Sequence, residues 1–146
     1  MRTLACSLFA VLMAAPPLLA ADKKIHAKDL PHAVQAAVQE ATRGAVITGY
    51  AREVEGGKTM FEVETTVNGH SRDLLFDAKG TLVSVEEATT LDAVPAAVRT
   101  ALEARGHVLT VEHVTKGKSV TYEAAIERNG KTSEFVVNAA GKPVKS

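Results

Sequence analysis

The side chains of this sequence that could act together in chemistry are carboxylates at alternate positions along predicted strands. Glu62 and Glu64 form one such pair, and Glu123, Glu127 and Glu134 recur in a later stretch. On a β-strand, residues two apart point to the same face of the sheet. Carboxylates gathered in this way could transfer protons, hold a cation or attract a basic partner. Proton transfer needs a cleft, which a flat sheet face does not supply, so we do not expect acid–base catalysis.

The other reactive residue types show no spacing typical of a catalytic or metal centre. No serine lies in a G-x-S-x-G context, and the single cysteine, Cys6, lies within an apolar N-terminal run. We therefore predict that the protein is not an enzyme and has no catalytic residue, no metal ligand and no cofactor. Surface positions are expected for the five histidines, which make no recognised metal-ligand pattern: His26, His32, His70, His107 and His113.

Two predicted hairpins must position the carboxylates. Asn68-Gly69 and Asn129-Gly130 each separate two strand-like stretches, which is the strongest short signal for a two-residue type I′ turn. Such a turn fixes the register of the strands outward from it. The resulting cross-strand pairs are Val67 with His70, Thr65 with Arg72, Glu64 with Asp73, Val63 with Leu74, Phe61 with Phe76, Tyr122 with Val137, and Ala124 with Phe135.

The chain repeats one plan twice. Leu30-Pro31 and Val94-Pro95 each open a stretch with apolar residues at helical spacing, and further strands flank each hairpin. We predict an α+β fold of two tandem helix-plus-four-strand antiparallel units, with the helices on one face of the sheet. Residues 22–88 form unit 1, residues 89–146 form unit 2, and the units pack as one compact domain. Their expected shared core comprises Val34, Val38, Phe61, Val63, Leu74, Phe76, Val98, Leu102, Tyr122, Ala124, Phe135 and Val137.

Residues 1–21 have the pattern of a cleavable export signal. Arg2 precedes a short apolar run, Pro16-Pro17 interrupt it, and small residues allow cleavage after Ala20 or Ala21. The run is too short to remain as a membrane anchor. Its removal leaves a chain without cysteine and with a net charge near −1, a balance that favours neither nucleic acid nor a membrane surface. We expect a periplasmic protein with no membrane insertion after removal of the signal.

The sheet face that the helices leave open is the predicted partner-binding surface. If Ile47 points toward the helices, simple alternation places Tyr50 and Arg52 on this open face. Aromatic, aliphatic and charged side chains would then mix as they do in protein interfaces. The alternative is an ordinary solvated face, which antiparallel sheets commonly have. The predicted set is Tyr50, Arg52, Glu62, Glu64, Asp73, Leu75, Glu123, Glu127, Glu134 and Val136.

These motifs resemble the PepSY-like family of exported bacterial proteins. The resemblance rests on Leu30-Pro31 with its helix, Phe61-Glu-Val-Glu, Asn68-Gly69 and Leu75-Phe76-Asp77-x-x-Gly80, and on their counterparts in the second unit, which ends early. Tandem units of this kind also resemble the β-lactamase-inhibitor fold, in which the uncovered sheet face grips an enzyme. The resemblance implies regulation of peptidases or ligand sensing outside the cytoplasm, and it supplies no catalytic residues.

Together these observations predict a non-catalytic periplasmic binding module. It would inhibit or regulate an enzyme such as a peptidase, and its partner would be another periplasmic protein held on the open face. A periplasmic sensor of a small ligand or metal ion is the alternative, using the open face or the histidines.

Overall fold

The computed structural model describes residues 23–144, so the predicted signal peptide at 1–21 lies outside the described part. Eight strands form one antiparallel sheet in which the spatial order follows the chain order. The strands are β1 (Lys23–Lys24), β2 (Val46–Glu55), β3 (Lys58–Val67), β4 (His70–Asp77), β5 (Leu82–Thr89), β6 (His107–Lys116), β7 (Ser119–Arg128) and β8 (Lys131–Asn138). The helices are a 3-10 turn η1 (Ala27–Asp29) and two α-helices, α1 (His32–Ala41) and α2 (Ala96–Glu103).

The expected architecture of two helix-plus-four-strand units is wrong. Strands β5 and β6 pair directly, with Glu87 opposite His113, so the sheet runs without a break through the middle of the chain. The short strand β1 adds to β2 ahead of the first helix. The second half has three strands, because the last segment makes only an isolated bridge between Val137 and Pro143. Proline has no N–H with which to extend a ladder.

Both hairpin registers are confirmed. Phe61 pairs with Phe76 and Glu64 with Asp73 in the first hairpin, and Tyr122 pairs with Val137 in the second. All four turn residues have positive φ, with 51° at Asn68, 81° at Gly69, 55° at Asn129 and 72° at Gly130. These values define type I′ turns, whose twist matches that of the strands they join.

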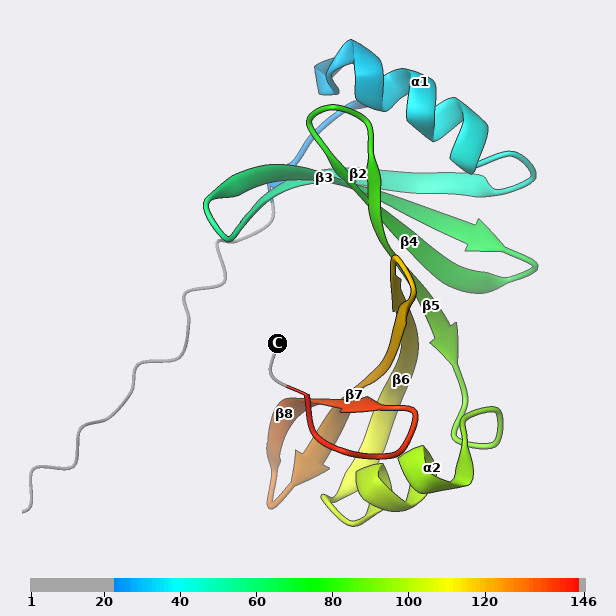
Figure 1. The fold of residues 1–146 in the computed structure, drawn as a ribbon, viewed down its shortest axis with the longest axis vertical. Helices are drawn as coiled ribbons and strands as arrows, with labels where there is room; N and C mark the ends of the chain where they lie inside the picture. Colours follow the sequence, from blue (N-terminus) through cyan, green and yellow to red (C-terminus); the bar gives the residue numbers. More distant parts are fainter. Residues whose placement is uncertain (1–22, 145–146) are drawn as a thin grey trace, which may run out of the picture.

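The sheet bends into an arch that carries one helix at each end (Figure 1). α1 packs on β3 and β4 through Val34 and Val38, which are one helical turn apart and buried. α2 packs on β6 to β8 through Val98 and Leu102 in the same manner. The cross-strand pairs place both helices against the same side of the sheet. We call that side the outer face and the opposite, concave side the inner face.

The expectation of one shared core is wrong, because the structure has two. Phe61, Val63, Leu74 and Phe76 pack under α1, and Val111, Ala124, Ile126 and Val137 pack under α2. Strands lie about 4.8 Å apart, so helices centred near β3–β4 and near β7 are separated by roughly 15–20 Å. A helix with its side chains is only about 10–12 Å wide. The middle of the outer face is therefore left without a helix.

Candidate functional site

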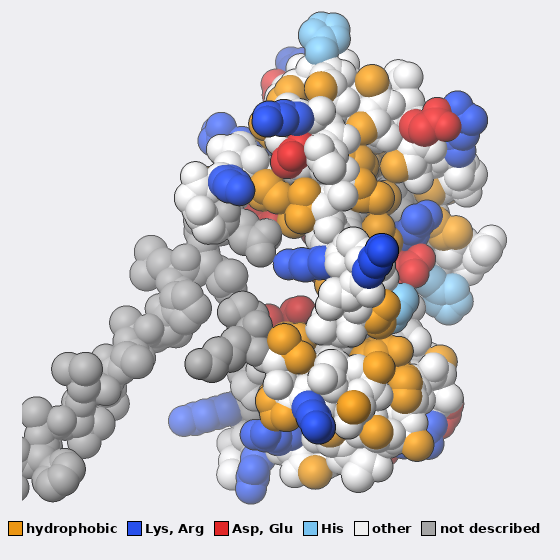
Figure 2. Space-filling model, viewed as in Figure 1, with side chains coloured by type: hydrophobic (Ala, Val, Ile, Leu, Met, Phe, Trp, Pro, Cys, Tyr) orange, Lys and Arg blue, Asp and Glu red, His pale blue; other side chains and the backbone are white. Residues whose placement is uncertain are grey.

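The inner face carries eight of the ten residues predicted for partner binding. Registers place Glu62 opposite Leu75, Glu123 opposite Val136, and Glu127 opposite Thr132. Glu64, Asp73 and Glu134 lie on the same face, because they occupy alternate positions on the same strands. Figure 2 shows acidic side chains in the opening of the arch.

Tyr50 and Arg52 lie on the outer face, so their predicted placement is wrong. Ile47 does point toward the helix side, opposite Thr65, but the register shifts between Ile47 and Gly49. This β-bulge adds one residue to β2 and reverses the alternation beyond it. Tyr50 then pairs with Val63 and packs against the core under α1.

Six carboxylates, one on each strand from β3 to β8, lie across the inner face, and we call them the acidic band: Glu64, Asp73, Glu86, Glu112, Glu123 and Glu134. Asp73 lies between Glu64 on β3 and Glu86 on β5, directly opposite each. Glu112 and Glu123 are likewise a direct cross-strand pair. A hollow of 330 Å³ is lined in part by Glu112, Glu123 and Glu134. Each of the six strands from β3 to β8 thus places a carboxylate on one concave surface.

Burial makes four carboxyls of the band hard to ionise, those of Asp73, Glu86, Glu112 and Glu123. It raises the pKa of Asp73, against a hydrogen bond from the Thr65 amide and with the added repulsion of Glu64. It also raises the pKa of Glu86 and of Glu112, and neighbouring acids add to both shifts. Lys116 partly opposes the shift at Glu86. The arch therefore holds like charges together while removing part of the water that would screen them.

Glu123 is the most perturbed group of the band. Burial, a side-chain hydrogen bond with Glu134 and the charges of Glu134, Glu86 and Glu112 raise its pKa from 4.5 to about 7. The protonated carboxyl is the donor in that hydrogen bond, since an ionised carboxylate can only accept. Part of the band is therefore neutral near pH 7 in the free protein.

We expect the protein to lose stability as pH rises from about 5 to 8. Glu123 binds its proton more tightly folded than unfolded, so its stabilising contribution is complete below pH 4.5 and disappears as pH passes about 7. The loss should be about 1–2 kcal/mol after allowance for partial solvent exposure. Urea unfolding at the two pH values measures it. Glu123→Gln should remove most of this slope, whereas Glu103→Gln on the exposed side of α2 should keep it. A wild-type protein that is more stable at pH 8 would contradict this prediction.

The sequence analysis missed Glu86 and Glu112, because no tight turn fixes the register between β5 and β6. The sequence does hold a signal for them. Adjacent polar residues recur where alternation would predict an apolar one: Arg72-Asp73, Glu86-Glu87, Glu112-His113 and Tyr122-Glu123. These pairs lie on neighbouring strands at the bend, with one member on each face. Consecutive polar residues indicate a region of sheet in which both faces are exposed to solvent.

The described residues supply no arrangement suited to a metal ion. Among residues 23–144, no group of three or more histidine, cysteine, aspartate or glutamate side chains is placed to hold one. His26, His32, His70 and His107 are exposed, and His113 is half-buried on the outer face. In the same range, no helix has the length and apolar character that crossing a membrane requires.

Comparison with known proteins identifies the fold. No protein-family model and no curated protein matches this sequence. A presumed periplasmic protein from Bacteroides eggerthii has 21% identity and a TM-score of 0.66, over 80% of this chain and 86% of its own. A DUF2874 family protein from Bacteroides ovatus has 18% identity and a TM-score of 0.64, over 80% and 85%. A BLIP-like protein from Bacteroides fragilis has 20% identity and a TM-score of 0.59, over 80% and 84%.

These structures confirm the expected resemblance to the β-lactamase-inhibitor fold, as a fold. The chain has the curved-sheet fold that a BLIP-like protein and presumed periplasmic proteins share. At such identities the likeness shows the fold alone. The resemblance to the PepSY-like family stays a prediction.

Proposed function

We propose that this chain is an exported, non-catalytic periplasmic protein whose acidic band docks on a basic surface of another periplasmic protein. Its partner would be an enzyme, such as a peptidase, that it inhibits or regulates. The observation that carries the proposal is the convergence of carboxylates from six strands on a concave face.

The energetics of the band favour a binding role over a merely solvated surface. Like charges directly opposite each other on paired strands destabilise a sheet. A solvated face could scatter its acids and avoid this repulsion, yet Glu64, Asp73 and Glu86 lie in direct register. A partner that carries lysine or arginine would relieve the repulsion. Binding would then regain the free energy that this repulsion costs the folded protein. Arrangements that lower the stability of the fold in this way are typical of surfaces that have a function.

The inner face also offers apolar contact between its acids. Leu75 is buried on this face, and Val136 is half-buried opposite Glu123. Ser84 lies opposite Leu75 on β5 and is 1% exposed, and its hydroxyl has no hydrogen-bond partner among the described residues. Apolar contacts would supply affinity, and the acids would supply orientation and a fast association that salt weakens.

Charge reversal within the band tests the proposal. The purified protein and the variant Glu64→Lys/Glu123→Lys are immobilised and exposed to periplasmic extract, and the affinity of the captured protein is then measured for each. We expect at least tenfold weaker binding by the variant, and weaker binding by the wild type as salt rises. The matched control is Glu40→Lys/Glu103→Lys, which makes the same charge change on the exposed sides of the two helices and should stay within twofold of wild type. A partner held equally by both variants would place the docking site elsewhere.

A further inference from the structure

A groove crosses the outer face between the two helix-covered ends. Its volume is 480 Å³, within the range of small-molecule sites. Figure 2 shows basic, acidic and histidine side chains gathered at this waist of the molecule. The groove is open because α1 and α2 cover separate cores and no helix within residues 23–144 lies over the strands between them.

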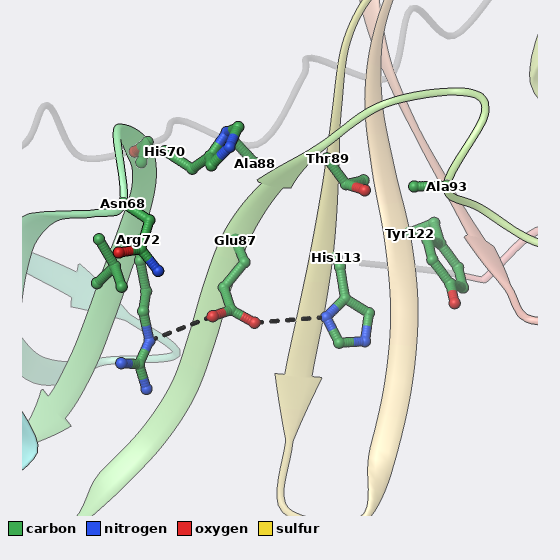
Figure 3. Close-up of a pocket in the computed structure, with 11 residues that line it drawn as sticks. Asn68, His70, Arg72, Glu87, Ala88, Thr89, Ala93, His113 and Tyr122 are labelled. Carbon is green, nitrogen blue, oxygen red and sulfur yellow. Dashed lines mark ion pairs between the residues drawn. The ribbon is translucent and has the colours of Figure 1, made fainter.

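A row of polar side chains forms the floor of the groove (Figure 3). Arg72 Nε lies 3.3 Å from Glu87 Oε1, and His113 Nδ1 lies 3.8 Å from Glu87 Oε2. The His113 and Tyr122 rings follow, with centroids 5.6 Å apart. Arg72 and His113 thus approach Glu87 from opposite sides, and His70 lines the groove at the start of β4.

The groove contains side-chain donors that have no acceptor among the described residues. The Arg72 side chain is only 31% exposed, and its buried Nε makes no hydrogen bond, because the approach of Glu87 is an ion pair without hydrogen-bond geometry. Among the described residues, neither His70 nor His113 makes a side-chain hydrogen bond, and His113 is too far from Glu87 for one. A guanidinium has five donors in a planar fork that fits a carboxylate or phosphate. Of the residues in the described range 23–144, Glu87 is the one carboxylate that lines the groove.

We propose that this groove binds a small oxyanion, a carboxylate or a phosphate, with Arg72 as its principal ligand. The anion accepts from the guanidinium, the histidines supply further donors, and the Tyr122 ring gives an apolar wall. Glu87 holds Arg72 in place and competes with the anion for it. This site is independent of the acidic band, which lies on the other face of the same strands.

Titration of the purified protein with acetate, succinate and inorganic phosphate tests the site, in a buffer that contains no other oxyanion. Side-chain NMR signals of His113 and Tyr122 report binding at the groove, and the three probes distinguish carboxylate from phosphate. We expect saturable shifts with at least one probe. Arg72→Gln should weaken that binding at least tenfold, whereas Arg43→Gln, which removes an exposed arginine of an ion pair after α1, should stay within twofold of wild type.

The variant Glu87→Gln distinguishes an oxyanion-binding role of Arg72 from a purely structural ion pair between Arg72 and Glu87. Removing the competing carboxylate should tighten oxyanion binding several-fold, while loss of a purely structural pair would leave affinity unchanged or weaken it. If Arg72→Gln does not fold, His113→Gln takes its place with an expected loss of at least threefold. The absence of saturable shifts with all three probes, or equal affinity in wild type and the groove variants, would overturn the proposal.

Discussion

Replacing Phe76 by alanine is expected to lower the free energy of unfolding by about 3–5 kcal/mol. Phe76 is 1% exposed and belongs to the core under α1. Its removal takes away the apolar contacts of a whole ring and leaves a cavity that a sheet and a single helix cannot close. Urea unfolding followed by circular dichroism measures the loss.

Two comparisons make the Phe76 prediction specific. Phe135→Ala should cost less, because Phe135 is only partly buried. Hydrogen exchange should accelerate more in β3 and β4 than in β7, since the two cores share no residue. A loss below about 1 kcal/mol for Phe76→Ala would show that this ring does not anchor the first core.

Replacing Gly80 by alanine is expected to cost about 3 kcal/mol. Gly80 has a φ of +82°, where a side chain brings a penalty of about 1–2 kcal/mol. A Cβ there would also lie 2.5 Å from the backbone carbonyl oxygen of Ala33 in the first turn of α1. The β4–β5 turn could accept it only by pushing the helix away from the sheet, which adds an overpacking cost of about 1–3 kcal/mol.

Gly57→Ala is the matched control for Gly80→Ala. Gly57 has a similar φ of +78°, but a Cβ there would meet nothing within 4 Å. Thermal and urea unfolding of both variants should therefore separate the backbone penalty from the loss of helix docking. Equal losses at the two positions would show that α1 yields to the new methyl group without cost.

The sequence by itself determined the local structure of this protein. Asn-Gly turns permit positive φ at two successive residues, and such a turn leaves only one register for the strands beside it. Val34 with Val38, and Val98 with Leu102, lie one turn apart, which is enough to predict each helix and the side that it buries. These short-range rules alone place eight of the ten residues predicted for the open face on the inner face.

Only the tertiary structure decided how these pieces combine. The bulge after Ile47 moved Tyr50 and Arg52 to the outer face, and its cost is offset by packing that no local pattern records. The pairing of β5 with β6 joined the halves into one sheet and brought Glu86 and Glu112 into the acidic band. The bend of that sheet separated the cores and opened the groove at Arg72. Registers across a long connection and the curvature of a sheet depend on the sum of many distant contacts, whereas a two-residue turn depends on the backbone of its own residues.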